Sequence, residues 1–225
     1  MRDIQFFYDP ISPYAYLAFE RLPEALMGHS VRMRYRPVLF AAMLKAGGQL
    51  GPAEIPSKRD WTYRQVSWLA HHHGTPLNLP AAHPFNPLAL LRLGLACALD
   101  DAPGETNRFV TEQLFRHVWL GGQDAVDPAR LQALEARLQE HMALRGRPWL
   151  SPDSDEVKHR LRANTEEALS LGVFGVPSMV LDGRVFWGQD ALPMLSACLQ
   201  SDAWFQSGDW EAAAALPVGI ARRSV

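Results

Sequence analysis

Strand-forming patterns lie at the two ends of this 225-residue chain, and helical patterns fill its middle. Residues 4–8 are mostly aromatic or β-branched and too few for a helix, so they predict a buried strand. Residues 14–26 carry apolar side chains at helical spacing, and residues 31–38 alternate as a half-exposed strand does. A strand, a helix and a strand in so short a segment predict a βαβ unit whose two strands are parallel.

Strand signals return near the C-terminal end. Residues 178–181 and 184–187 flank Asp182-Gly183, a dipeptide typical of a hairpin with a type I′ turn. The helices predicted outside the first unit are residues 43–49, 61–72, 86–100, 105–120, 128–142, 155–171 and 189–199.

This chain order is that of an α/β thioredoxin-like fold with a large all-helical insertion, although other α/β folds also carry helical insertions. Residues 1–40 and 172–205 would form the thioredoxin-like domain, residues 41–171 the insertion, and residues 206–225 a C-terminal tail. We expect the aromatic residues near the tail to pack on the body and residues 221–225 to fray.

Composition excludes several classes of function. The formal net charge is −2, so no global field favours nucleic acid or an anionic membrane. No apolar run approaches the ~20 residues that cross a bilayer, and the N-terminal segment lacks the apolar core of a secretory signal. We therefore expect a cytoplasmic protein without a nucleic-acid or membrane partner.

The cysteines and a run of histidines predict no metal site. Cys97 and Cys198 form neither a C-x-x-C pair nor a zinc spacing, and both lie in apolar contexts typical of buried thiols. Adjacent histidines at 71–73 point in different directions on a helix, so they do not converge on one ion. Any thiol chemistry would have to come from a substrate or a cofactor.

Three short motifs could carry chemistry. Ser12 before Pro13 is typical of a helix cap, and the free N–H groups of that helix end also favour an anion such as a thiolate. Pro177 opens a strand, which predicts a cis Val176–Pro177 bond that turns the Val176 backbone toward an extended ligand. Asp190 at the start of a helix is either a cap or an acceptor for the ammonium of an amino-acid-like ligand.

These motifs together resemble one enzyme family. Residues 7–18 (Phe-Tyr-Asp-Pro-Ile-Ser-Pro-Tyr-Ala-Tyr-Leu-Ala), 175–178 (Gly-Val-Pro-Ser) and 186–190 (Phe-Trp-Gly-Gln-Asp) are similar to the 2-hydroxychromene-2-carboxylate isomerase family. That family is related to kappa-class glutathione transferases and to disulfide oxidoreductases of the DsbA type. The resemblance implies a DsbA-like thioredoxin fold, glutathione as cofactor and a homodimer.

The resemblance also implies roles for matched residues. Ser12 stands where the oxidoreductases have their first reactive cysteine, and it would donate a hydrogen bond to the glutathione sulfur. The implied glutathione contacts are Val176, Pro177, Gln189, Asp190 and Lys58. Val176 would pair its backbone with the cysteinyl part, Gln189 and Asp190 would hold the γ-glutamyl end, and Lys58 would meet the glycine carboxylate.

Substrate contacts are expected for a second group of residues, which are Tyr14, Arg36, Lys45, Gln49 and Asn86. Gln49 stands where relatives often have asparagine near the substrate, and Asn86 matches a family position that faces the site. Arg36, Lys45 and Lys58 are candidates to meet a substrate carboxylate, although a charge of this kind is more often a solvated surface charge.

The sequence thus favours a glutathione-dependent isomerase of aromatic-compound breakdown, in which glutathione thiolate adds reversibly to the substrate while a ring opens. One alternative is a kappa-like transferase that conjugates glutathione to electrophiles. Another is a thioredoxin-fold binding protein in which Ser12 is only a cap. A disulfide oxidoreductase is disfavoured because residue 12 is not cysteine.

Overall fold

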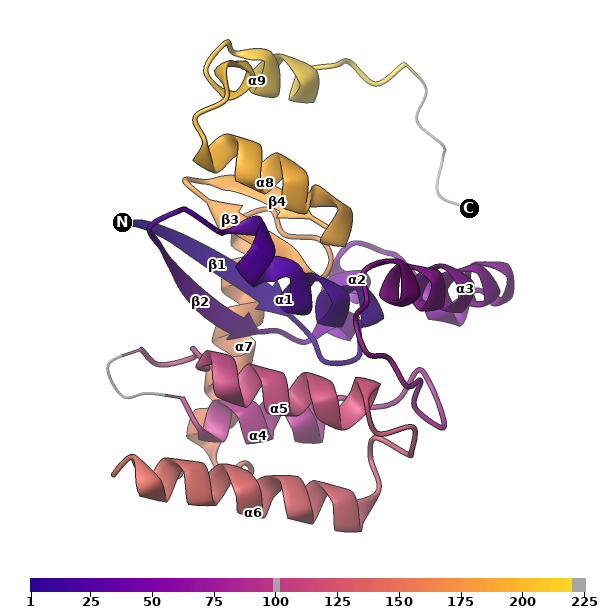
Figure 1. The fold of residues 1–225 in the computed structure, drawn as a ribbon, viewed down its shortest axis with the longest axis vertical. Helices are drawn as coiled ribbons and strands as arrows, with labels where there is room; N and C mark the ends of the chain where they lie inside the picture. The colour runs from indigo at the N-terminus through magenta and orange to yellow at the C-terminus, as the bar shows by residue number, and fades with distance from the viewer. Residues whose placement is uncertain (99–101, 220–225) are drawn as a thin grey trace.

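Residues 1–98 and 102–219 are described by a computed structural model, in which four strands form one sheet of order β2-β1-β3-β4 (Figure 1). The strands are β1 (Arg2–Tyr8), β2 (Val31–Pro37), β3 (Ser178–Leu181) and β4 (Arg184–Trp187). β1 is parallel to β2 and antiparallel to β3, and β3 is antiparallel to β4. Asp182 and Gly183 have φ of 49° and 79°, as a type I′ turn requires, so the predicted βαβ unit and hairpin are confirmed.

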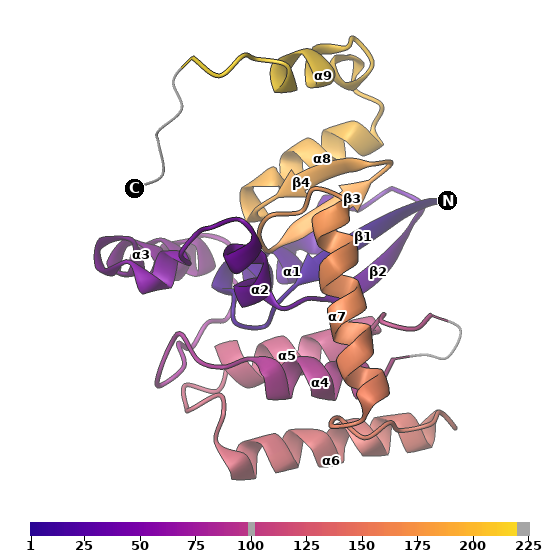
Figure 2. The same cartoon turned by 180° about the vertical axis from the view of Figure 1, so that it is seen from behind.

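Helices cover both faces of the sheet. They are α1 (Pro13–Ala25) and α8 (Leu192–Leu199) on one face, and α2 (Phe40–Ala46) and α7 (Asp155–Ser170) on the other. Ile4, Phe6 and Tyr8 pack in the core shared with α1 and α8, whereas Phe7 packs with residues of α2 and α7. Successive side chains of β1 thus serve opposite faces. Figure 1 shows α1 in front of the sheet. Figure 2, which views the molecule from the opposite side, shows α7 in front of the sheet.

The middle of the chain is helical. It contains η1 (Pro52–Glu54), α3 (Pro56–His72), α4 (Leu88–Ala96), α5 (Arg108–Trp119) and α6 (Pro128–Leu144). α4, α5 and α6 lie beyond the β2 edge, where Thr106 forms a single bridge to Tyr35, and α3 projects from the body (Figure 1). None of the helices in the described residues is long and apolar enough to cross a membrane. α2 and α7 belong to the predicted insertion, yet they pack on the sheet of the predicted thioredoxin-like domain. The predicted domain boundaries stay a prediction.

Caps and prolines set helix ends that the apolar spacing placed elsewhere. α3 starts at Pro56, before the predicted residue 61, because proline suits the first turn of a helix. α5 starts at Arg108 because the Asn107 side chain caps it. The predicted helix 189–199 is split into η2 (Gln189–Ala191) and α8, because Pro193 fits only the first turn of α8.

Two further helices also differ from their predicted bounds. α2 begins and ends earlier than the predicted 43–49. α4 begins at Leu88 and ends at Ala96, and the predicted end at residue 100 lies outside the described residues.

The tail packs on the body as predicted, through η3 (Ala203–Phe205) and α9 (Asp209–Ala214). The Phe186 ring lies 6.0 Å from that of Phe205 and 5.5 Å from that of Trp210. Residues 221–225, predicted to fray, lie outside the described residues.

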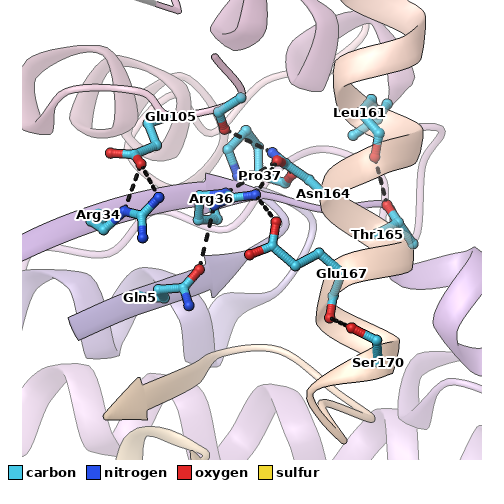
Figure 3. Close-up of polar contacts among 11 residues, drawn as sticks. Gln5, Arg34, Arg36, Pro37, Glu105, Leu161, Asn164, Thr165, Glu167 and Ser170 are labelled. Atoms are coloured by element: carbon cyan, nitrogen blue, oxygen red, sulfur yellow. Dashed lines mark hydrogen bonds and ion pairs between the residues drawn. The ribbon is translucent and has the colours of Figure 1, made fainter. Parts of the chain in front are cut away.

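The second half of β2 is not half-exposed as predicted, because α7 covers the face that carries Arg36. The Arg36 guanidinium donates to Asn164 Oδ1 at 2.8 and 3.1 Å and pairs with the Glu167 carboxylate (Figure 3). Arg36 is only 5% exposed. It therefore fastens β2 to α7 on the face opposite α1, which corrects the interpretation of Arg36 as a substrate contact.

Asp9 fastens the loop that follows β1. Its buried carboxylate accepts hydrogen bonds from the Ile11 amide at 3.1 Å and from the Phe40 amide at 3.0 Å. These bonds tie the approach to α1 to the start of α2. Burial raises the pKa of Asp9 to about 7, and the two amide donors only partly offset this effect.

We predict that the Asp9 carboxyl makes stability fall as the pH rises from about 4 to about 7. In this range the folded protein keeps a proton that the unfolded chain, with a pKa of 3.8, has released. The loss is at most about 1.4 kcal/mol per pH unit. Urea unfolding of wild type and Asp9→Asn across this range measures it, because the variant cannot titrate here. A stability difference independent of pH would contradict the prediction.

Candidate functional site

Ser12 lies between the end of β1 and the start of α1, where it caps the helix. Its backbone is extended, with φ −85° and ψ 117°, and its Oγ accepts a hydrogen bond from the Ala15 amide at 3.2 Å. The same hydroxyl donates to the Val176 carbonyl at 3.3 Å. The capping role is therefore confirmed, and a second contact joins the start of α1 to the loop before β3. Ser12 is 8% exposed, so neighbouring atoms shield its hydroxyl from bulk water.

The loop before β3 contains the predicted cis bond. The Val176–Pro177 peptide is cis, and Val176 is buried. The Pro177 carbonyl accepts a hydrogen bond from the Gly188 amide at 2.9 Å. This loop, called the cis-proline loop below (residues 175–178), is therefore bonded both to Ser12 and to the segment that follows β4.

The segment after β4 carries the predicted γ-glutamyl contacts. Gly188 has φ 94°, a conformation that favours glycine, and a Cβ there would meet the Asp190 carboxylate. Gln189 is 7% exposed, and its Oε1 has no hydrogen-bond partner among the described residues. Such an oxygen costs about 1–3 kcal/mol when it stays unpaired. It is therefore suited to accept a hydrogen bond from a ligand, beside the exposed Asp190.

Tyr14 lies beside this segment because α1 packs against η2. Its hydroxyl donates to Gln65 Oε1 on α3 at 2.7 Å. Burial raises the pKa of Tyr14, and the negative charge of Asp190 adds to the rise. The predicted residues that these contacts bring together are Ser12, Tyr14, Val176, Pro177, Gln189 and Asp190.

Four other predicted residues lie at the surface. Lys45 is at the end of α2, Gln49 follows that helix, and Lys58 is in the first turn of α3; all three are exposed. Asn86 is also exposed, and its Oδ1 accepts a hydrogen bond from the Leu88 amide at 3.1 Å, at the start of α4. Their proposed ligand contacts stay predictions.

Two ring nitrogens hold the backbone just before Ser12, and no sequence pattern pointed to them. Trp119 Nε1 donates to the Pro10 carbonyl at 2.9 Å, and His83 Nε2 lies 2.7 Å from the Ile11 carbonyl oxygen. Both rings come from the helical middle of the chain. His83 belongs to the segment His-Pro-Phe-Asn-Pro at residues 83–87, in which the family resemblance indicated a role for Asn86 and not for the histidine.

Comparison with known proteins agrees with this geometry. The family model of the DSBA-like thioredoxin domain matches residues 3–200. The 2-hydroxychromene-2-carboxylate isomerase of Pseudomonas putida is 28% identical over 207 residues, covering 87% of this chain and 93% of the relative. Glutathione S-transferase kappa 1 of Rattus norvegicus is 26% identical over 212 residues, covering 90% and 92%.

A solved structure shares the fold. The structure of a 2-hydroxychromene-2-carboxylate isomerase superposes with a TM-score of 0.68 at 24% identity, over 92% of this chain and 98% of the other. The family match includes the Ser12 loop, the cis-proline loop and the segment after β4, so it spans every part of the site. The four-stranded sheet with its helical covering is the DsbA-like thioredoxin fold that the sequence predicted. The chain therefore belongs to the DSBA-like thioredoxin domain family, among relatives that are isomerases and kappa-class glutathione transferases.

Proposed function

We propose that this protein is a glutathione-dependent isomerase that acts on 2-hydroxychromene-2-carboxylate or a similar intermediate of aromatic-compound breakdown. The observation that carries the proposal is the Ser12 hydroxyl, which lies at the positive end of α1 and is bonded to the cis-proline loop. The relatives named 2-hydroxychromene-2-carboxylate isomerase support this choice of reaction. We also propose that it works in the cytoplasm as a homodimer.

The residues at this site fit glutathione. The unpaired Gln189 Oε1 and the exposed Asp190 offer acceptors for the ammonium of a γ-glutamyl group. The buried Val176 in the cis-proline loop offers its backbone to the cysteinyl part, and Lys58 in the first turn of α3 would meet the glycine carboxylate. When bound, glutathione supplies a thiolate that can add reversibly to a conjugated double bond.

Ser12 would stabilise that thiolate without being consumed. Its hydroxyl has one proton, which is now donated to the Val176 carbonyl over a long 3.3 Å. Rotation about the Cβ–Oγ bond lets the same proton point to sulfur while Oγ still accepts from Ala15. A hydrogen bond to a charged acceptor is stronger than one to a neutral carbonyl, so this exchange favours the thiolate. The positive end of α1 acts in the same direction.

Substrate contacts are proposed for residues around this centre. The Tyr14 hydroxyl, whose single proton is donated to Gln65 Oε1 here, would turn that proton to an oxygen of the substrate. Lys45 provides an exposed cation for a substrate carboxylate. Gln49 and Asn86 keep their proposed places near the substrate, whereas Arg36 is neutralised by Glu167 and is not proposed again.

A kappa-like transferase is the second candidate, because kappa-class relatives match this chain about as well as the isomerases do. The two reactions differ in the fate of glutathione, which an isomerase regenerates and a transferase consumes. Assays with 2-hydroxychromene-2-carboxylate and with a general electrophile, each following free glutathione, separate them. Substrate turnover at constant free glutathione supports the isomerase, and stoichiometric loss of glutathione supports the transferase.

We predict that Ser12→Ala raises the pKa of bound glutathione and lowers kcat by ~100-fold, because one preorganised hydrogen-bond donor to the reacting anion is lost. The affinity for glutathione should change much less, since its two ends are held elsewhere. Ultraviolet titration of the thiolate, steady-state kinetics and calorimetry measure these three quantities.

Ser154→Ala is the matched control for Ser12→Ala. Ser154 caps α7 by accepting a hydrogen bond from the Val157 amide at 3.3 Å, as Ser12 does for α1. Both variants should therefore lose the ~1 kcal/mol of stability that a cap provides, and Ser12→Ala also loses the hydrogen bond to the Val176 carbonyl. Only Ser12→Ala should affect the thiolate. Equal thiolate pKa and kcat in wild type and Ser12→Ala would show that Ser12 is a cap alone, and the proposed mechanism would be abandoned.

We predict that Asp190→Ala weakens glutathione binding by roughly 10-fold to 100-fold, because a charge-assisted contact worth ~1.5–3 kcal/mol is lost. Asp202→Ala is the control, since Asp202 is an exposed aspartate that accepts a hydrogen bond from the Trp204 amide at 2.9 Å. Calorimetry should show wild-type affinity for the control. An unchanged affinity in Asp190→Ala would refute the γ-glutamyl contact.

A further inference from the structure

The backbone before Ser12 is held by two aromatic ring N–H groups on successive carbonyls. Trp119 Nε1 takes the Pro10 carbonyl at 2.9 Å, and His83 Nε2 takes the Ile11 carbonyl at 2.7 Å. Trp119 is fully buried at the end of α5, and His83 lies in the segment between α3 and α4. The end of α5 and the segment between α3 and α4 therefore hold the loop that presents Ser12.

The contacts of His83 determine which nitrogen carries the proton. A carbonyl oxygen only accepts hydrogen bonds, so Nε2 must be the protonated nitrogen facing Ile11. In the neutral ring Nδ1 is then the acceptor, and the Tyr63 hydroxyl, 2.8 Å away, donates to it while also lying 3.2 Å from the His83 carbonyl oxygen. The Tyr63 hydroxyl, the His83 ring and the Ile11 carbonyl thus form one chain of hydrogen bonds.

The surroundings of the imidazole keep it in this orientation and neutral. The rings of Trp119 and Phe85 lie 5.5 and 5.9 Å from it. The Arg59 guanidinium donates to the backbone carbonyl of His83 at 3.2 Å. Burial lowers the pKa of His83 and the charge of Arg59 lowers it further, while the hydrogen bond to Ile11 offsets only part of this effect.

Both polar atoms of the peptide group between Ile11 and Ser12 are thereby occupied. Its carbonyl is bonded to His83, and its N–H, on Ser12, donates to the Asp9 carbonyl at 3.0 Å. With this peptide plane fixed, only φ and χ1 of Ser12 remain to set the position of Oγ, and the contacts of Oγ with Ala15 and Val176 restrict both. An error of ~1 Å in such a position can cost ~100-fold in rate.

We propose that His83 is a positioning residue, whose Nε2–H clamps the Ile11 carbonyl and so sets the place of the Ser12 hydroxyl. Its catalytic consequence rests on the proposed function of Ser12. The clamp itself does not, because it is a property of the protein without glutathione.

The test compares His83→Phe, which keeps an aromatic ring but has no donor, with His83→Gln, whose amide offers both a donor and an acceptor. His117→Phe is the control, because His117 is also half-buried and its Nε2 lies 2.9 Å from the Ala125 carbonyl, outside the Ser12 loop. The first readout is the hydrogen exchange of the Ser12 amide by NMR, measured without glutathione. The second is the thiolate pKa of bound glutathione together with kcat and KM for 2-hydroxychromene-2-carboxylate.

We expect exchange of the Ser12 amide to accelerate ~10-fold or more in His83→Phe and to stay within ~3-fold of wild type in His83→Gln and His117→Phe. We also expect His83→Phe to raise the thiolate pKa and lower kcat ~10-fold to 100-fold with little change in KM. Should His83→Phe not fold, Tyr63→Phe replaces it, with a smaller acceleration expected because the proton is then free to move to Nδ1.

If exchange of the Ser12 amide is unchanged in His83→Phe, the proposed role of His83 is refuted, whatever the kinetics show. Equal acceleration in His117→Phe also overturns it, since the effect would then be general loosening. If wild type does not bind glutathione, the proposed function fails while the exchange comparison still decides the clamp.

Discussion

The hydrogen bond between the Ser12 hydroxyl and the Val176 carbonyl is the contact on which the site depends. It joins the start of α1 to the cis-proline loop, two segments that come from opposite ends of the chain. The parallel pairing of β1 with β2 and the antiparallel pairing of β1 with β3 bring those ends together. Strand pairing therefore brings the two segments close together, and the hydrogen bond from the Ser12 hydroxyl joins them. Because the bond is long at 3.3 Å, it can be exchanged for a stronger bond to an anion without a change of backbone.

The helical middle of the chain is part of the site as well as a covering for the sheet. Trp119 and His83 reach from it to the Pro10 and Ile11 carbonyls. Tyr14 is bonded in the other direction, from α1 to Gln65 on α3. An insertion that only shielded apolar surface would need no polar contacts of this kind, since burial alone is non-directional. Hydrogen bonds are directional, and these fix an orientation as well as a distance.

Local patterns predicted the strands, the hairpin turn and the caps at Ser12 because those features depend on neighbouring residues. The family resemblance implied ligand roles for Ser12, Val176 and Asp190, and these roles stay predictions. The described structure brings the segments that carry the three residues together. The role of Arg36 could not be predicted, because its partners Asn164 and Glu167 are remote in the sequence and become neighbours only when α7 covers β2 (Figure 3). His83 and Trp119 were missed for the same reason, since a carbonyl that needs a donor leaves no trace in sequence.

The cysteines of this chain explain why the proposed sulfur chemistry needs a thiol supplied by a ligand. Cys97 is buried, its thiol donates to the Leu93 carbonyl at 3.5 Å, and burial raises its pKa to about 12. Cys198 is buried in α8. A thiol must be deprotonated and accessible to act as a nucleophile, and these two are held in packing roles. Serine at position 12 leaves the positive end of α1 without a sulfur of its own. The same backbone that would stabilise a protein thiolate in an oxidoreductase is thus free to stabilise the thiolate of a bound ligand.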